Sequence, residues 1–237
     1  MSHSPRKDKV FIALMAAACI SCLSYGLSQS NAWHLSALLV LLAVSVASSR
    51  MKVKLPGLTG TMSVNLPFLL LAVSELGLVE TMAVACATAV VQTIPEDWAR
   101  PKPERLVFNT STMAVASAMA WQVFRHGASS HVPSALLVCL ATVTFFLGQT
   151  LPVSTIIALT TGGPWRKVWM SMALLTFPYF VLSAGVAFMM AAGGRAGWQI
   201  PFAVLPLMFG VFLSYRLYFR TAAPDEKTLV LAASSGR

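Results

Sequence analysis

Charged residues are scarce in this 237-residue sequence, and acidic residues are the scarcest of them. Asp and Glu occupy 8 positions against 17 for Lys and Arg, and charged residues make up 11% of the chain. Soluble domains carry about 25%. With 57% hydrophobic residues and a mean hydropathy of +0.72, too little polar surface remains to cover a soluble domain. A water-soluble fold is therefore excluded.

Motifs of common enzyme classes are also missing. The sequence contains no G-x-S-x-G, no H-E-x-x-H, no phosphate-binding P-loop and no G-x-G-x-x-G. We therefore expect no enzymatic activity and no cofactor. The alternative is an intramembrane enzyme, for which Glu75 or Glu80 would be the only plausible acid or base.

Cysteine and histidine are few, and their spacing does not predict a metal site. The four cysteines all lie inside apolar runs (Cys19, Cys22, Cys86 and Cys139). Cys19 and Cys22 form C-x-x-C, but in the middle of an apolar run this spacing favours small buried thiols over redox or metal chemistry. His34, His126 and His131 leave open a metal or pH-sensing site near Glu75 and Glu80.

Eight long apolar runs are what the sequence does contain. Most approach the roughly 17–25 residues that an α-helix needs to cross a bilayer. The runs are Val10–Ser28, His34–Ser49, Met62–Ser74, Leu78–Thr93, Leu106–Phe124, Pro133–Thr161, Val168–Ala192 and Gln199–Tyr215. We therefore expect an all-α fold, a polytopic membrane helix bundle with about eight transmembrane segments.

Basic residues are unevenly distributed between the two sides that alternating crossings would define. Fifteen of the 17 Lys and Arg fall on one side, whereas Arg125 and Arg195 fall on the other. Because short loops rich in Lys and Arg stay in the cytoplasm, both termini should be cytoplasmic. The net charge of +9 then mainly sets the membrane topology, and it also favours contact with anionic membrane lipids. We expect no nucleic acid partner.

The runs also predict how the chain is divided. We expect a cytoplasmic tail at 1–9, a single transmembrane domain at 10–215 and a second cytoplasmic tail at 216–237. A basic start followed by Val10–Ile20 also fits a cleaved signal peptide. The apolar stretch continues past Tyr25, which favours a spanning helix.

The third and fourth runs are together too short for two ordinary crossings. Met62–Thr93 contains 32 residues, about 48 Å of helix at 1.5 Å per residue. Pro67 and the polar residues before it favour a short or re-entrant first half, which is tolerated at membrane depth beside a water-filled cavity. Glu75 and Glu80 then either guard the outer mouth of this cavity or are solvated in an ordinary turn.

Polar side chains inside apolar runs are candidates for a ligand site, because they are costly in hydrocarbon. We expect Asn65, Asn109 and Gln149 to bind ligand, together with Glu75 and Glu80. Further polar candidates are Gln92, Thr110, Thr112, Gln122, Thr144 and Tyr179. The alternative is that these groups only form hydrogen bonds between helices.

One helical face combines polar and small residues. Asn109, Thr112 and Met113 share it by their spacing. Ala116 and Ala120 continue it as a small-residue seam that allows close helix approach.

The sequence is similar to a known group in two stretches: Arg50–Asn65 (RMKVKLPGLTGTMSVN) and, after two apolar runs, Arg105–Thr110 (RLVFNT). It resembles the multi-helix membrane sensor domains of the vitamin-uptake-like type that precede diguanylate cyclase and HD-GYP outputs in bacteria. In these domains a basic, β-like entry precedes a short apolar segment, and a helix that begins with Phe-Asn follows. They are similar in turn to the S-components of energy-coupling-factor transporters. The resemblance covers about Arg50–Trp121 and implies the bacterial inner membrane.

The resemblance also implies a function. No cyclase or HD-GYP sequence follows Tyr218, so we expect a separate partner protein that contacts Pro95–Arg105 and Pro164–Lys167. The expected function is sensing or capture of a small-molecule ligand in a pocket that opens outward. The alternative is an S-component-like subunit or a small transporter for uptake of a vitamin-like molecule.

Overall fold

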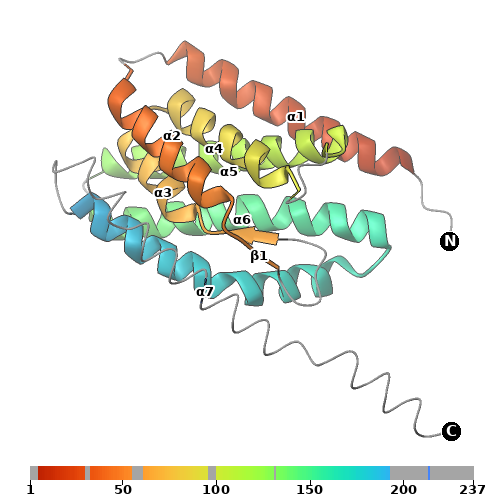
Figure 1. Ribbon diagram of the computed structural model, residues 1–237. Helices are drawn as coiled ribbons and strands as arrows, with labels where there is room; N and C mark the ends of the chain where they lie inside the picture. Colours follow the sequence, from red (N-terminus) through yellow and green to blue (C-terminus); the bar gives the residue numbers. More distant parts are fainter. Residues whose placement is uncertain are drawn as a thin grey trace, which may run out of the picture.

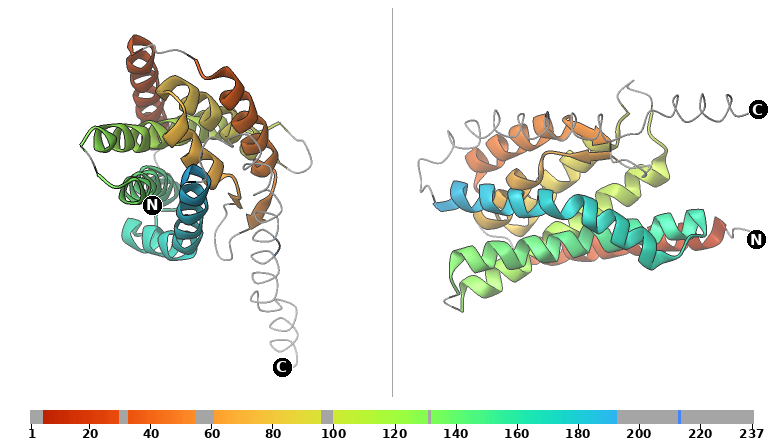
Figure 2. Two further views of the ribbon diagram at one scale, coloured as in Figure 1. Left: turned by 90° about the vertical axis from the view of Figure 1, so that its left-hand side faces the viewer. Right: turned by 90° about the horizontal axis from the view of Figure 1, so that it is seen from below.

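Seven helices and one short β-hairpin make up the described part of the chain (Figure 1). The computed structural model describes residues 5–29, 33–54, 61–95, 100–130, 132–192 and 213. The helices are α1 (Pro5–Ser28), α2 (Leu35–Ser49), α3 (Leu66–Glu75), α4 (Leu78–Thr93), α5 (Pro103–Ala128), α6 (Ser134–Thr161) and α7 (Trp165–Ala192). Strands β1 (Lys52–Lys54) and β2 (Thr61–Ser63) pair antiparallel. Two further views show the helices packed side by side as a bundle (Figure 2).

Three of the described helices are long and apolar enough to cross a membrane. These are α1 over Lys7–Ser28, α6 over Ser134–Thr161 and α7 over Trp165–Met190. Helices α2, α3 and α4 are apolar but shorter. The membrane helix bundle predicted from the sequence is thus confirmed in outline, with the hairpin added to it. The expected count of eight crossings is not confirmed, and Gln199–Tyr215 lies outside the described residues except for residue 213.

Helix α3 lies at the centre of the bundle and is buried on every side. Its residues from Leu66 to Val73 are all buried, and helices α2, α4, α5, α6 and α7 all contact it. Ten residues give about 15 Å of helix, half of a roughly 30 Å hydrocarbon core. The backbone N–H of Leu66 donates to the Tyr179 hydroxyl of α7 at 3.0 Å. The short helix expected in the first half of Met62–Thr93 is thus present, and it is enclosed by five other helices.

Helices α5 and α6 approach each other closely through small residues. A Cβ atom added at Gly148 would lie 3.1 Å from the Cα of Ala116, and Ala116 and Ala120 are both fully buried. The predicted small-residue contact at Ala116 is therefore confirmed.

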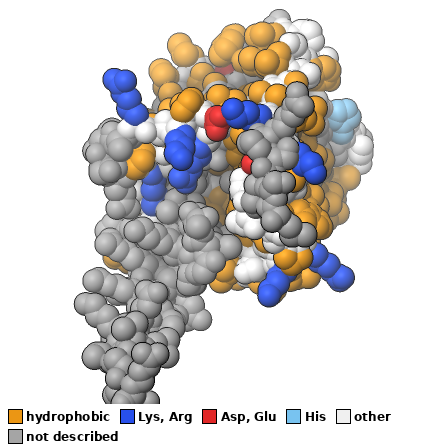
Figure 3. Space-filling view, turned by 90° about the vertical axis from the view of Figure 1, so that its right-hand side faces the viewer, with side chains coloured by type: hydrophobic (Ala, Val, Ile, Leu, Met, Phe, Trp, Pro, Cys, Tyr) orange, Lys and Arg blue, Asp and Glu red, His pale blue; other side chains and the backbone are white. Residues whose placement is uncertain are grey.

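Basic side chains gather at one end of the bundle, which we call the basic end. Helices α1, α5 and α7 begin there, α2, α4 and α6 finish there, and the hairpin lies beside them (Figure 1). Figure 3 shows Lys and Arg side chains spread over this end. The described basic residues in these segments are Lys7, Lys9, Arg50, Lys52, Arg100, Lys102, Arg105, Arg166 and Lys167. Arg125, in the last turn of α5, lies at the opposite end, which we call the far end.

The hairpin is fixed to the bundle through the end of α4. The side chains of Arg50 and Lys52 both donate hydrogen bonds to the carbonyl oxygen of Ile94. Ile94 follows the last residue of α4 and has an extended backbone, so the helix stops there. Cations at a helix C-terminus are favourable because they face the negative end of the helix dipole.

Candidate functional site

A cavity of about 530 Å³ extends from the basic end into the bundle, and we call it the central cavity. Four charged residues line its mouth at the starts of α1 and α5: Asp8, Lys102, Glu104 and Arg105. They are exposed or partly exposed. Buried apolar residues close its inner end, and these are Leu66, Leu69, Met113, Phe145 and Phe180. The cavity therefore reaches from a charged, open mouth to the start of the buried helix α3.

The structure brings three of the predicted site residues together. Asn65, Asn109 and Gln149 all line the central cavity, from three different helices or helix starts. Asn65 is the residue before α3, Asn109 lies in the second turn of α5, and Gln149 follows Gly148 at the close contact of α5 with α6. Asn109 Nδ2 donates to Thr93 Oγ1 of α4 at 3.0 Å.

Two buried polar groups at the inner end of the cavity have no hydrogen-bond partner. They are Asn65 Nδ2 and Thr112 Oγ1, in side chains that are 4% and 2% exposed. Burying such a group without a partner costs about 1–3 kcal/mol. The side-chain oxygen of Asn65, Oδ1, accepts from Ser63 Oγ at 3.1 Å, so the unpaired atom of this side chain is Nδ2 of its NH₂ group. These groups favour a polar occupant of the cavity.

The further polar candidates from the sequence divide into two groups. Gln92, Thr112 and Tyr179 line the central cavity, as do Met113 and Asn109 of the same α5 face. The other three, Thr110, Gln122 and Thr144, are not among the lining residues. Sequence reasoning identified which residues are polar inside apolar runs, but it could not tell which of them face one cavity.

Several lining residues had not been singled out from the sequence. Thr150 and Thr176 line the cavity from α6 and α7, each two residues before a proline inside its helix, Pro152 and Pro178. A hydroxyl beside a helix-interrupting proline is a pattern that could have marked them. The charged mouth has no such signal: Lys102 and Arg105 lie in a basic segment that predicts membrane topology and a partner contact, and their spacing does not indicate a cavity.

The structure corrects the expected place of Glu75 and Glu80 at the cavity mouth. Neither residue lines the central cavity. Glu75 is exposed at the end of α3, as an ordinary solvated turn residue would be. Glu80 is 4% exposed and lies in the first turn of α4, at the far end. The mouth is at the basic end, so the pocket does not open on the side where these glutamates lie.

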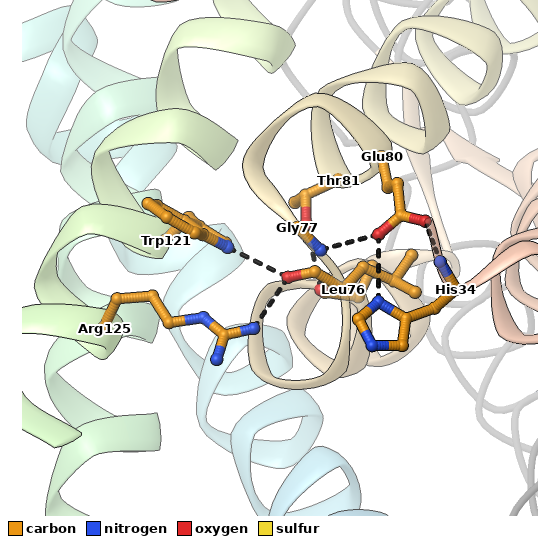
Figure 4. A network of polar contacts seen from close by, with 8 residues as sticks. His34, Leu76, Gly77, Glu80, Thr81, Trp121 and Arg125 are labelled. Carbon is orange, nitrogen blue, oxygen red and sulfur yellow. Dashed lines mark hydrogen bonds and ion pairs between the residues drawn. The ribbon is translucent and has the colours of Figure 1, made fainter. Parts of the chain in front are cut away.

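Glu80 joins the starts of two helices (Figure 4). Its Oε2 accepts the backbone N–H of Gly77, the residue before α4, at 2.8 Å. Its Oε1 accepts the backbone N–H of His34, the residue before α2, at 2.6 Å, and His34 Nδ1 lies 3.5 Å from Oε2. A carboxylate at helix N-termini is favourable because it faces the positive end of each helix dipole. The side chain therefore serves the architecture of the far end.

The break between α3 and α4 is held by α5 through the same network (Figure 4). Trp121 Nε1 and Arg125 Nη2 each donate to the carbonyl oxygen of Leu76 at 3.0 Å. The Arg125 guanidinium also lies over the Trp121 ring, 5.5 Å from its centroid. Thr81 Oγ1 donates to the carbonyl oxygen of Ala72 at 3.0 Å. The Trp121 and Arg125 donors satisfy the Leu76 carbonyl, which lies at the helix break. The Ala72 carbonyl, which already accepts the N–H of Leu76, is tied by Thr81 to the first turn of α4.

The cysteines and histidines of the described residues do not form a metal centre. Cys19, Cys22 and Cys86 are partly buried around one small apolar cluster between α1, α4 and α5. No group of three His, Cys, Asp or Glu side chains within the described part of the chain is arranged to hold a metal ion. His131 lies outside the described residues.

Comparison with known proteins identifies one family. The model of the MASE9 family matches residues 14–220, most of the chain. No curated protein and no solved structure matches the chain. The matched range includes every residue at the inner end of the central cavity.

Proposed function

Because the chain belongs to the MASE9 family, a family of membrane-associated sensor domains, we propose that it detects a small molecule bound in the central cavity. The observation that carries this proposal is the pair of unpartnered polar groups at the inner end, Asn65 Nδ2 and Thr112 Oγ1. Burial of such groups is unfavourable unless ligand or water supplies the missing hydrogen bonds. A ligand that supplies them gains affinity from this site.

We also propose that the cavity binds its ligand without chemical change. Amides, hydroxyls and apolar groups line its inner part. The charged lining residues Asp8, Lys102, Glu104 and Arg105 lie only at the mouth, and no His or Cys is among the described lining residues. Nucleophilic and general acid–base catalysis rely on a reactive group held beside a base. Amides and hydroxyls instead fix the orientation of a bound molecule.

The direction of the mouth favours sensing over uptake. If the basic end faces the cytoplasm, as short basic loops of inner-membrane proteins do, the ligand enters from the cytoplasm or the inner leaflet. A vitamin-uptake subunit, the alternative function, has to take its ligand from outside. In this proposed orientation, the central cavity opens at the opposite end from the one such a subunit would use.

Orientation can be measured by cysteine labelling of intact cells. In a chain whose four native cysteines are replaced, we expect cysteines introduced at Ser129 and Ala196 to react with an impermeant thiol reagent. Cysteines introduced at Ala99 and Ala223 should be protected until the cells are opened, because the basic clusters hold their loops inside. Labelling of Ala99→Cys or Ala223→Cys in intact cells would reverse the orientation and place the mouth outside.

Ligand occupancy can be tested with a variant that fills the cavity. Ile157 lines the cavity from α6, whereas Leu140 of the same helix is 45% exposed. Protein is purified in nanodiscs from native-host membranes, and the released small molecules are compared by mass spectrometry. We expect one compound to be enriched with the wild type and with Leu140→Trp but absent from Ile157→Trp, because the indole occupies its space.

The comparison of the two tryptophan variants separates binding from folding. Both must elute as a single species and retain helical circular dichroism before they are compared. If the wild type and Ile157→Trp release the same compounds in the same amounts, the central cavity is not a ligand site.

A separate partner protein completes the proposal. The connection between α6 and α7 contains Gly162, with a positive φ of 70°, and then Pro164, followed by exposed Arg166 and Lys167 at the basic end. The stacked rings of Trp165 and Trp169, with centroids 6.0 Å apart, support this loop. The other expected contact, Pro95–Arg105, lies partly outside the described residues.

Mild-detergent affinity purification tests for the partner. We expect an acidic cytoplasmic protein to be retained by the wild type and lost when Arg166 and Lys167 are both replaced by Glu, because the charge of the contact is reversed. Recovery of transporter ATPase subunits, or ligand uptake by vesicles that contain the chain alone, would instead support the uptake alternative.

A further inference from the structure

The inner end of the central cavity is built around the N-terminus of α3. A helix N-terminus carries a partial positive charge, which favours electronegative groups. Asn65 stands at the N-cap position, yet its side chain makes no capping hydrogen bond. Its side-chain oxygen Oδ1 accepts a hydrogen bond from Ser63 Oγ, and its NH₂ group is buried without a partner. A hydrogen-bond donor is therefore available to the cavity at the positive end of a ten-residue helix.

Thr112 supplies a second unpaired group. Several other buried threonines of the bundle donate their hydroxyl to the carbonyl four residues earlier, as Thr142 does to Val138 and Thr176 to Met172. Thr112 is equally buried and lines the cavity, but its hydroxyl has no partner. Its proton is therefore available to an acceptor in the cavity.

The surrounding walls define the rest of the ligand. Phe108, Phe145 and Phe180 line the cavity, and they form an apolar surface that suits a flat ring. The backbone N–H of Leu66 is already bonded to Tyr179. Among the fully buried side-chain groups that line the cavity, those of Asn65 and Thr112 are without a partner. At the mouth, the basic charges of Lys102 and Arg105 are accompanied by Asp8 and Glu104.

We propose that the ligand is an apolar ring compound whose acceptor oxygen, in a carbonyl or a carboxylate group, binds at the N-terminus of α3 between the donors of Asn65 and Thr112. This inference rests on the proposed function, because it names the chemistry of the molecule that is sensed. A ketone and a carboxylate offer the same acceptor to these donors. They differ in charge, and the mixed charges of the mouth admit both.

Three matched probes test the acceptor oxygen. They are 2-acetylnaphthalene, 2-naphthoate and 2-isopropylnaphthalene, which has the shape of the ketone but no oxygen. Binding to the full chain in nanodiscs is measured by equilibrium dialysis, with empty nanodiscs subtracted. We expect wild-type protein to bind at least one oxygen-bearing probe roughly tenfold more tightly than the hydrocarbon, the effect of one to two net hydrogen bonds. The preferred probe shows whether the site takes the neutral or the anionic oxygen.

Two neighbouring threonines of α5 provide the matched variants. Thr110 and Thr112 both have buried hydroxyls without partners, but only Thr112 lines the cavity. Thr112→Val should lower affinity for the oxygen-bearing probe about fivefold and leave the hydrocarbon unchanged. Thr110→Val should change neither. Asn65→Leu should remove the preference for oxygen, and Thr112→Val keeps the test valid if Asn65→Leu does not fold.

The outcomes distinguish this inference from the proposed function. If all three probes bind equally and Ile157→Trp blocks them, the cavity is a ligand site, but the proposed recognition of an acceptor oxygen by Asn65 and Thr112 is refuted. Equal effects of Thr110→Val and Thr112→Val refute it as well. If no probe binds and no compound is released from the wild-type protein, the proposed function fails together with the inference.

Discussion

Replacing Glu80 by alanine is expected to lower the free energy of unfolding by about 3 kcal/mol, because two backbone N–H groups lose a charged acceptor at once. The carboxylate accepts from Gly77 at 2.8 Å and from His34 at 2.6 Å, and it is almost completely buried. Both N–H groups precede helices, so the starts of α2 and α4 lose their common cap. Unfolding in mixed detergent micelles, followed by tryptophan fluorescence, measures the change.

Glu75 provides the matched control for this effect. It is also a glutamate of the α3–α4 segment, but it is exposed. Glu75→Ala should therefore change the free energy of unfolding by no more than about 0.5 kcal/mol. Similar effects of the two substitutions would show that Glu80 does not hold the helix starts together.

Asn109→Leu should weaken ligand binding by about 1–3 kcal/mol, since its amide lines the central cavity and a leucine there can form no hydrogen bond. It should also cost about 1 kcal/mol of stability, because Asn109 Nδ2 donates to Thr93 Oγ1 across the α4–α5 contact. Isothermal titration in nanodiscs, with the compound that the wild type releases, measures the first effect. Asn65→Leu should have the same effect on affinity.

A second amide of α5 separates the two roles. Gln122 has a buried, unpartnered oxygen but is not a lining residue of the cavity. Gln122→Leu should leave ligand affinity unchanged. If Asn109→Leu and Asn65→Leu bind the compound normally but give a poor folded yield, the amides only join helices, and the ligand role at these positions is refuted.

Most helices could be predicted from the sequence because apolar runs bounded by charged or turn residues define them. The run Pro133–Thr161 agrees closely with α6, and His34–Ser49 with α2. Helix α5 extends beyond its expected run at both ends, from Pro103 to Ala128, because its charged ends at the bundle surface continue the helix without being apolar. Hydropathy marks the apolar part of a helix, and not where its hydrogen bonding ends.

The hairpin and the role of Glu80 were harder to predict. Strands of three residues are too short to show an alternating pattern, although the resemblance pointed to a β-like entry after Arg50. Glu80 stands three residues after Gly77, the spacing by which a glutamate reaches back to cap a helix start. That signal was present, but its partner His34 lies 46 residues away, and no local pattern joins them.

The amide residues of the candidate site could be predicted from the sequence, but the end of the bundle toward which the cavity opens could not. Polarity within apolar runs identified Asn65, Asn109 and Gln149, which the fold brings to one cavity. The expectation that the pocket opens outward was tied to Glu75 and Glu80, and these lie away from the cavity. Which end of a bundle a cavity opens toward depends on how helices tilt and rotate, and single-helix patterns leave both undetermined.

Helix α3 also constrains the order in which the chain can be assembled. It is ten residues long and enclosed on all sides, so neither lipid nor water can take the place of its neighbours. The hydroxyl that accepts from Leu66 belongs to Tyr179, 113 residues later. At about 5–20 residues per second, the ribosome needs on the order of 10 s to synthesise that interval. The surroundings of α3 are therefore incomplete until α7 has been made, and a nascent chain that lacks α7 exposes the surfaces around α3 to quality control.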